Sequence, residues 1–407
     1  MKVLWLGHNL AFPPKGGALQ RNYNLLREIA RSCEVHMLAF DQPVTRPDNV
    51  APSDCVRELA KFCASVDWVP LTTASRYSLA LRGIFSGEPY DFAWLRSPEM
   101  QRKLDDVLAR VNPDVIHVDA LGLAQFAPRP EARPTLLNHH DVESCKIAVR
   151  AQKTSSLPLR TYFAMEAKKL AAAEYRWCPR FGVNAVVSEA EGDVLRAVNP
   201  AVRVAVVPNG VDTEFFRPRK DPGGQKIVFC GSMDMHPNQE AVHYFIEKLW
   251  PSISAKVPTA TFDIVGRKPP QWVEALAQTD SRVRVTGFVE DVRPYFEEAT
   301  VCVSPIVSGG GTRLKILDSL AMGVPVVSTP FAASGLDLQH GRHVLLPDTD
   351  AQFIEDTVRL LNAPTERAVL AQHGAQRVDE LYSWRVVGKT LLQAYETARQ
   401  FTAARVA

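Results

Sequence analysis

Two cationic side chains follow closely on a run of three glycines in the second half of the chain. Glycines occupy positions 309–311, Thr312 follows them, and Arg313 and Lys315 come next. Three consecutive glycines are costly to order unless their backbone must approach something closely. The N–H groups at the start of a helix, with two cations beside them, attract phosphate oxygens. The pattern predicts a diphosphate-binding loop, and a tight turn with two solvated cations is the alternative.

The elements on either side of this loop have different periodicities. Residues 301–305 form a short apolar run that is typical of a buried parallel strand. Leu314, Leu317 and Leu320 recur at helical spacing, and the Gly-Val-Pro sequence at 323–325 ends that helix before the next strand. The glycine loop is therefore expected between the end of a strand and the start of a helix.

A second glycine loop lies near the start of the chain, inside a predicted strand–helix–strand unit. Gly16 and Gly17 precede the helix, and Lys15 and Arg21 are near them in sequence. Such a loop suits an anion or a sugar. The G-x-G-x-x-G pattern of dinucleotide-binding loops is absent. A simple turn is the alternative interpretation of this segment.

Several histidines stand at the ends of predicted strands. His8 follows the first strand, His117 lies at the end of a later one, and His139 and His140 follow the next. Ligands of open α/β sheets lie beyond the carboxyl ends of strands, so these histidines are candidates for ligand contact. Because side chains alternate along a strand, His139 is expected to point away from the side of His140. No carboxylate–histidine cluster has metal-ligand spacing in the sequence, so no metal site is expected.

The alternation of strands and helices predicts two doubly wound α/β domains. The expected strands cover 2–6, 35–40, 65–70, 115–118, 134–138, 184–187, 202–207, 226–231, 261–265, 283–286 and 326–327. The main expected helices cover 18–31, 56–64, 77–85, 99–110, 161–176, 239–249, 352–361 and 366–381. A segment rich in proline, glycine and charge around 208–224 resembles a domain boundary. The domains are therefore expected at 1–207 and 208–384, with a 385–407 tail helix folding back onto the first.

Composition excludes some classes of protein and partner. The chain has 407 residues and a formal charge of +2, which gives no electrostatic case for nucleic acid. Seven cysteines without a CxxC motif favour a reducing compartment, and no apolar run is long enough to span a bilayer. A cytoplasmic protein is expected. The cations Lys168, Lys169 and Arg176 of one predicted helix suggest peripheral contact with the inner face of the plasma membrane, and a solvated crossover helix is the alternative.

Several longer motifs resemble a known enzyme family. These are VVPNGVDTEFF (206–216), FCGSMDMHPN (229–238), FDIVG (262–266), VTGFVEDV (285–292), GGGTRLKILDSLAMGVPVVST (309–329) and SGLDLQHGRHVLL (334–346). Their order and spacing resemble the family-4 type of retaining glycosyltransferases of the GT-B fold, above all those of bacterial polysaccharide and exopolysaccharide clusters. The first half is similar only through its glycine loop and the NHHDVES segment at 138–144.

This resemblance implies two Rossmann-like domains that face a central cleft. The second would bind a nucleotide-sugar donor, with a UDP-sugar favoured, and the first a glycan or lipid-linked acceptor. No cofactor beyond the donor is implied. The resemblance assigns catalytic contacts with the donor to His140, Arg313 and Lys315. It assigns donor binding to Gly16, Gly17, Gly231, His236, Asn238, Arg267, Phe288, Val289, Gly310, Gly311, Thr312 and Asp318.

Two departures from the family pattern leave other functions open. Family members commonly carry two glutamates eight positions apart, where this chain has Gly310 and Asp318. The usual Arg and Lys after the first strand of the donor domain are replaced by the sequence from Met233 to Asn238. A nucleotide-sugar epimerase and a non-catalytic nucleotide-sugar-binding subunit are therefore kept as alternatives.

Overall fold

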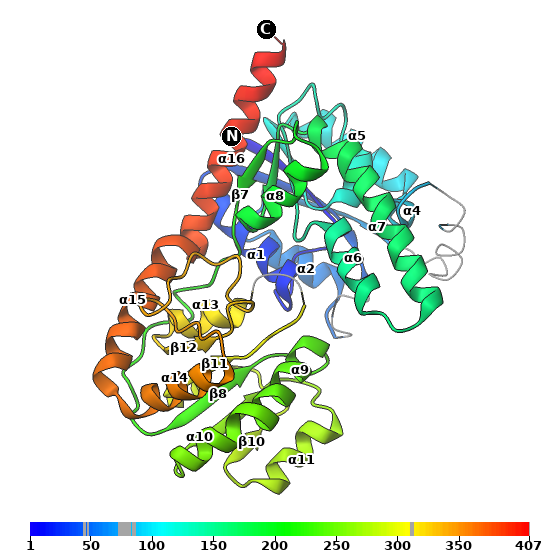
Figure 1. The fold of residues 1–407 in the computed structure, drawn as a ribbon. Coiled ribbons are helices and arrows are strands. Elements are labelled where there is room, and N and C mark those ends of the chain that lie inside the picture. Colours follow the sequence, from blue (N-terminus) through cyan, green and yellow to red (C-terminus); the bar gives the residue numbers. More distant parts are fainter. Residues whose placement is uncertain (44–45, 47–48, 72–82, 84–86, 310–312, 407) are drawn as a thin grey trace. The chain divides into compact units, whose positions relative to one another are not determined.

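The computed structural model describes residues 1–406 apart from 44–45, 47–48, 72–82, 84–86 and 310–312 (Figure 1). The chain divides into two compact units. Unit 1 comprises Met1–Pro208 with Val387–Ala407, and unit 2 comprises Asn209–Val386. The first division falls one residue, and the second two residues, after the positions expected from the sequence. Each unit has its own buried apolar core.

Unit 1 is built on a seven-stranded parallel sheet in the order β3-β2-β1-β4-β5-β6-β7. The central strands are short and apolar because helices cover both of their faces. The strands are β1 (Lys2–Gly7), β2 (Glu34–Asp41), β3 (Ser65–Pro70), β4 (Val115–Val118), β5 (Thr135–Asn138), β6 (Val183–Val186) and β7 (Val204–Val206).

The helices of unit 1 differ from the sequence expectation in two ways. Those described are α1 (Gly17–Ile29), α2 (Pro52–Leu59), α4 (Tyr90–Leu95), α5 (Pro98–Val111), η2 (Leu121–Phe126), α6 (Glu143–Lys153), α7 (Leu157–Trp177), η3 (Cys178–Arg180) and α8 (Glu189–Val198). Of these, α2 and α7 begin earlier than expected, with α2 also ending five residues before the expected 64, and α4, α6 and α8 are not among the expected helices. Prolines in the first turns of α2 and α7 begin both helices four residues earlier than predicted, since a proline needs no helical N–H partner there. The helical turns predicted over 77–85 lie outside the described residues except for Gly83.

Unit 2 is built on a five-stranded parallel sheet in the order β10-β9-β8-β11-β12. The strands are β8 (Lys226–Cys230), β9 (Thr261–Val265), β10 (Val283–Val285), β11 (Val301–Ser304) and β12 (Val326–Ser328). The helical elements are α9 (His236–Tyr244), η4 (Phe245–Leu249), α10 (Trp250–Lys256), α11 (Gln271–Thr279), α12 (Arg293–Glu298), α13 (Leu314–Ala321), α14 (Asp350–Asn362) and α15 (Pro364–Tyr382). The helix predicted over 239–249 is longer and passes through a π turn at η4 before Pro251, which has no N–H for the helical ladder.

Both sheets reverse their strand order next to their first strand. In unit 1 the reversal lies between β1 and β4, and in unit 2 between β8 and β11. The crevice at such a switch point is the usual ligand position of open α/β sheets. His8 and Asp119 follow β1 and β4, whereas Gly231 follows β8 and the glycine run at 309–311 follows β11. The strand order therefore predicts a ligand site in each unit, at the ends of these strands.

The last helix, α16 (Trp384–Val406), begins in unit 2 and packs in unit 1. Its buried side chains, which include Leu391 and Tyr395, recur at helical spacing along one face. Gly388 brings the helix against α1, where a side-chain carbon at position 388 would lie 2.7 Å from Cβ of Glu28. The C-terminal helix thus belongs mainly to unit 1, although its first residues belong to unit 2.

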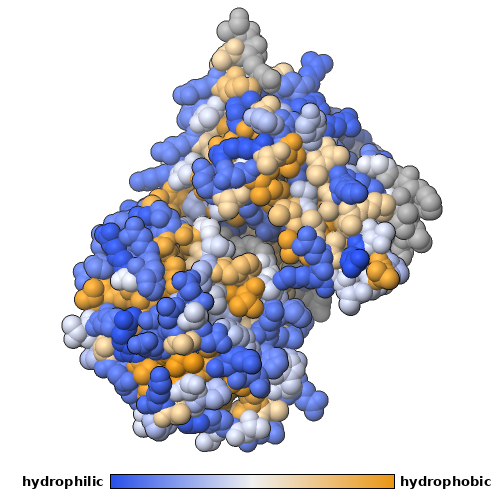
Figure 2. Space-filling view, in the orientation of Figure 1, coloured by the Kyte–Doolittle hydropathy of each residue, from blue (hydrophilic) through white to orange (hydrophobic). Residues whose placement is uncertain are grey.

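The surface gives no sign of a membrane-spanning element. No helix within the described parts of the chain is long and apolar enough to span a bilayer. On the face drawn in Figure 2, hydrophobic residues form small patches among hydrophilic ones.

Candidate active site

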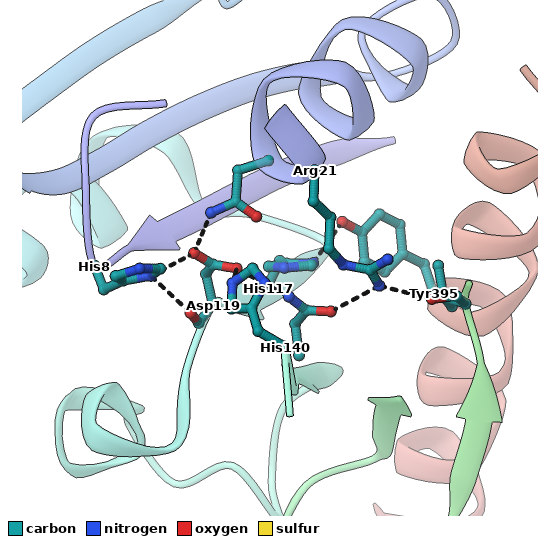
Figure 3. Close-up of polar contacts among 9 residues, drawn as sticks. His8, Arg21, His117, Asp119, His140 and Tyr395 are labelled. Carbon is teal, nitrogen blue, oxygen red and sulfur yellow. Dashed lines mark hydrogen bonds and ion pairs between the residues drawn. The ribbon is translucent and has the colours of Figure 1, made fainter. Parts of the chain in front are cut away.

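The polar cluster of unit 1 is centred on Asp119, directly after β4. Its side chain is fully buried, and its backbone N–H donates to the Leu6 carbonyl at 3.0 Å. His8 Nδ1 lies 2.8 Å from one carboxylate oxygen, and His140 Nε2 lies 3.0 Å from the other. The amides of Asn22 and Asn138 donate to the same carboxylate (Figure 3). Four side chains from β1, α1 and β5 therefore converge on one buried anion.

These contacts fix the charge of the cluster. Burial alone would raise the pKa of Asp119, but His140 and His8 hold it well below its ordinary value. Burial lowers the pKa of His140 despite Asp119, whereas the carboxylate outweighs burial at His8 and raises its pKa. An ionised carboxylate only accepts hydrogen bonds, so Nε2 of His140 carries its hydrogen. A neutral His140 then presents Nδ1 as a hydrogen-bond acceptor.

The other two strand-end histidines have structural roles. His139 points away from Asp119 and lies 3.1 Å from the Asn184 side chain, as the alternation along a strand predicts. His117 stacks on Trp5 with ring centroids 3.6 Å apart and bonds to the Tyr395 hydroxyl of α16 at 2.9 Å. Burial lowers the pKa of His117 to about 3 and that of His139 to about 4. The expectation that His117 is a ligand-contact candidate is therefore wrong.

Arg21 is also not a surface cation near the first glycine loop. It is buried and donates at 2.7 Å to the carbonyls of Val207 and Pro208, beyond the end of β7 (Figure 3). Burial lowers its pKa to about 10. Arg21 thus connects α1 to the segment that follows β7, at the far edge of the sheet, and its guanidinium group does not serve as an anion-binding cation. Gly16 and Gly17, by contrast, have open space where a side chain would begin, and Gly16 has a φ of 100°.

One sequence-based statement about metals needs correction. The ligand atoms of His8, Asp119 and His140 all lie within 4.8 Å of one another, which is close enough for one ion. The sequence hides this cluster because its members come from three separate strand ends. The two histidines already stand at hydrogen-bond distance from the carboxylate, and two amides use its remaining acceptor capacity. We therefore describe it as a hydrogen-bonded network.

The polar cluster of unit 2 is centred on Lys315, in the first turn of α13. Its ammonium group bonds to the Asn238 side-chain oxygen at 2.8 Å and lies 4.0 Å from the centre of the Phe229 ring. A side-chain carbon at Gly231 would come within 2.7 Å of this ammonium and 2.8 Å of the Asn238 amide carbon. A larger residue at position 231 would displace the Lys315 ammonium group or the Asn238 amide from this arrangement. The sequence-predicted donor residues Gly231 and Asn238 are thus brought together with Lys315.

Asp318, one turn further along α13, is the least satisfied group of this cluster. Its Oδ1 is buried and has no hydrogen-bond partner among the described residues. Burial raises the pKa of Asp318 to about 7 and lowers that of Lys315 to about 7. Lys315 is therefore not the full positive charge that the sequence suggested at neutral pH. Each group reaches its charged form most readily when a ligand supplies the missing partner.

Arg313 lies at the start of the same helix, beside the glycine loop. Its guanidinium group donates to the Ser308 carbonyl at 3.1 Å and lies 5.8 Å from the Phe331 ring centre. Gly309 has a φ of 99° and contacts Pro237 so closely that a side chain would clash. The remaining predicted loop residues, Gly310, Gly311 and Thr312, lie outside the described residues.

The other predicted donor residues are not equally close to Lys315. Arg267 reaches from the end of β9 and donates to the Ser232 hydroxyl at 2.7 Å, while the Ser232 carbonyl accepts from Asn238. Arg267 therefore borders the cluster. His236, at the start of α9, and Phe288 are exposed, and Val289 packs against the core of unit 2. Within the described contacts these last three make no hydrogen bond to the cluster.

Comparison with known proteins relates both halves of the chain to glycosyltransferases. A family model described as glycosyltransferase family 4 matches residues 15–215, and one described as glycosyl transferases group 1 matches 224–363. The MMP α-(1→4)-mannosyltransferase of Mycolicibacterium hassiacum is 27% identical over 299 residues, which are 70% of this chain and 71% of that protein.

Solved structures resemble the fold at lower sequence identity. Sucrose-phosphate synthase from Thermosynechococcus elongatus is 20% identical with a TM-score of 0.70, over 99% of this chain and 100% of that one. Anabaena HepE, whose crystal structure holds UDP and glucose, is 14% identical with a TM-score of 0.64, over 97% and 99% of the two chains.

Two parallel, doubly wound sheets, each with polar groups gathered at its switch point, and a sugar-transferase model matching each half define a GT-B glycosyltransferase. Enzymes of this class take their sugar from a nucleotide-sugar donor. Within the class, the chain belongs to the family-4 type.

Sequence reasoning found the unit 2 cluster but missed the centre of the unit 1 cluster. The sequence interpretation assigns a role to His140 and none to Asp119 or His8. The available signal was their position after β1 and β4, the two strands that flank the switch point. Asn22 and Asn138 gave no signal, since nothing in the sequence places an amide of α1 against a residue almost a hundred positions away.

We expect His140→Ala to lower sugar transfer by at least about tenfold, the loss of one hydrogen bond involving a charged or reacting group. His139→Ala should reduce thermal stability, because it leaves the buried Asn184 side-chain oxygen without the His139 ring as its partner, and should spare the activity of the folded fraction. Steady-state kinetics normalised to folded protein separate the two effects. A larger activity loss in His139→Ala would overturn the assignment of His140.

The pKa of Lys315 predicts that nucleotide binding takes up a proton. At pH 8.5 a lysine with a pKa of about 7 is mostly neutral, and a bound diphosphate raises that pKa by stabilising the ammonium form. Asp318, with a pKa of about 7, is already ionised at this pH and contributes little. Calorimetry of UDP binding in buffers of different ionisation enthalpy should show uptake near pH 8.5 and less near pH 6. Lys315→Met should abolish it; equal heats in all buffers for the wild type would contradict the site.

Proposed function

We propose that this enzyme transfers a hexose from a nucleoside diphosphate hexose to a glycan or lipid-linked acceptor, with retention of the anomeric configuration. A UDP-hexose is the favoured donor. The observation that carries the proposal is the incompletely satisfied pair of Lys315 and Asp318 beside the glycine loop at the switch point of unit 2. A diphosphate would complete the first group and ribose hydroxyls the second.

The chemistry of the leaving group fits this arrangement. When a glycosidic bond to a nucleotide breaks, negative charge develops on the diphosphate. Donors that are aimed at this charge stabilise the transition state more than the ground state. Lys315, Arg313 and the N–H groups at the start of α13 can all contribute, each charge-assisted hydrogen bond being worth roughly 1.5–3 kcal/mol. His140, on unit 1, is proposed to contact the transferring sugar.

The relatives support the sugar and nucleotide classes. The Mycolicibacterium relative is named as an α-(1→4)-mannosyltransferase, which is a hexosyl transfer that forms an α linkage. HepE has been crystallised with UDP and glucose. A role in polysaccharide or glycoconjugate biosynthesis is consistent with the sequence motifs described above.

Catalysis without a metal is part of the proposal, as is the lack of a resident cofactor. Cationic side chains of unit 2 take the role that a divalent ion has in other nucleotide-dependent transferases. The one group of described residues that could hold an ion, His8, Asp119 and His140, is engaged in hydrogen bonds. Loss of activity in EDTA, restored by a divalent ion, would make that cluster a metal site instead.

The proposal predicts donor selectivity and product stereochemistry. A thermal-shift panel of UDP-, GDP- and ADP-sugars identifies the donor, and transfer from it should continue in excess EDTA. NMR of the product should show the anomeric configuration of the donor. An inverted product would contradict the retaining mechanism. Isomerisation of the donor without acceptor would indicate an epimerase, and binding without turnover on a broad acceptor panel would indicate a binding subunit.

A peripheral membrane contact through unit 1 is a second part of the proposal. Helices α6 and α7 form a hairpin (Figure 1), and the stretch 147–165 contains three cations, Arg150, Lys153 and Arg160, and no acidic residue. Leu157 and Leu159 at its connecting end are 66% and 53% exposed. Lys169 is not available for this role, because it pairs with Glu166 at 2.9 Å. Exposed leucines beside cations suit an anionic lipid surface.

We expect the protein to sediment with vesicles that contain phosphatidylglycerol and to remain in solution with phosphatidylcholine alone. Combined Leu157→Ser and Leu159→Ser substitutions should weaken sedimentation several-fold, and added salt should weaken it further. Val369→Ser, at a 50% exposed position in unit 2, is the matched control. Equal sedimentation of the double variant and the wild type would exclude the hairpin as the contact.

A further inference from the structure

A cavity of about 130 Å³ lies in unit 1, beside the hydrogen-bonded network of Asp119. Part of its polar lining is not used by the donor assignment. His8 and His140 line the cavity, and so do Trp94 and three acidic residues, Asp91, Asp141 and Glu143. All of these residues belong to unit 1.

The three carboxylates differ in their partners. Asp141 and Glu143 share Lys146, whose ammonium group lies 2.8 Å and 3.5 Å from them. Asp91, in the first turn of α4, is partly buried and makes no hydrogen bond or ion pair within the described chain. Burial raises its pKa, only partly offset by Lys146. Its carboxylate oxygens therefore keep their acceptor capacity for a ligand in the cavity.

The position of Asp91 is fixed by close packing. Gly122, in η2, faces α4, and a side-chain carbon there would lie 2.9 Å from Leu95 and 3.4 Å from Cβ of Asp91. Gln125 donates from η2 to the Phe92 carbonyl at 3.0 Å. Helix α4 is therefore held directly on the segment that follows Asp119. This packing fixes the part of α4 that places Asp91 on the wall of the cavity.

The charge of the residues that line the cavity determines which kinds of acceptor substrate it can bind. Three carboxylates with one lysine repel a phosphate or a carboxylate, whereas hydroxyl groups donate hydrogen bonds to carboxylates without a change of charge. An aromatic ring offers a flat apolar surface beside these acceptors, a common composition of small-molecule sites. We propose that this cavity binds the hydroxyl groups of an uncharged sugar on the acceptor, and that Asp91 is its specificity-determining residue. The inference rests on the proposed function, which places the acceptor on unit 1.

Saturation-transfer NMR on the full chain tests the proposal without requiring turnover. The probes are methyl glycosides of glucose, galactose and mannose, set against methyl glucuronide and glucose 6-phosphate. We expect the neutral glycosides to bind and the anionic sugars to bind at least tenfold more weakly. In Asp91→Asn the affinity for the neutral glycosides should fall at least about tenfold, as for a lost hydrogen bond to a charged group.

Glu99→Gln removes an exposed carboxylate from the neighbouring helix α5 and is the matched control. Asp91→Ser replaces Asp91→Asn if the latter does not fold. Anionic sugars that bind as well as neutral ones, or Asp91 variants with wild-type affinity, would overturn the proposal. Thermal shifts with nucleotide sugars are recorded on the same samples. If these shifts persist while neutral glycosides fail to bind, the acceptor inference fails and the donor assignment stands; their absence counts against the proposed function itself.

Discussion

The arrangement of unit 1 depends on keeping one buried carboxylate ionised. Asp119 has lost its contact with water, and an unpaired charge in such a place is far more costly than the fold could tolerate. Its compensation comes from two histidines that follow β1 and β5 and from two amides on α1 and β5. These elements can reach one point only where the strand order reverses. The same contacts that stabilise the anion therefore orient His140 and leave its free ring nitrogen as an acceptor.

Unit 2 follows the opposite principle. There a lysine and a carboxylate are partly buried on α13, the carboxylate with one buried oxygen that has no partner among the described residues, and the pKa values of both move to about 7. Such a pair is costly in the free protein and becomes favourable when a ligand brings phosphate and hydroxyl groups. The complete hydrogen-bond network of unit 1 holds its side chains in fixed positions. The incomplete network of unit 2 leaves polar groups that can bind a substrate and release it again.

The two units are linked through more than their connecting segment. Helix α16 begins in unit 2, and its buried face packs in unit 1, where Tyr395 bonds to His117. His117 in turn stacks on Trp5 of β1, the strand that leads to His8. His117, which the sequence suggests as a ligand-contact candidate, therefore supports β1, the strand that leads to His8. Its low pKa keeps it neutral, as a buried stacking position requires.

Interactions between neighbouring residues determine much of the secondary structure, so the sequence predicts it well. The periodicity of α13, the short apolar strands, and the glycines that precede helices all depend on neighbours in the chain, so β3 and β9 have the predicted bounds. Only the tertiary structure decided which polar groups meet. Arg21 lies early in α1, and His117 and Asp119 lie at the end of β4. In the folded chain Arg21 joins α1 to the segment after β7, His117 supports β1, and Asp119 is a buried anion. Their roles follow from burial and from partners up to almost three hundred residues away, and a linear pattern contains neither.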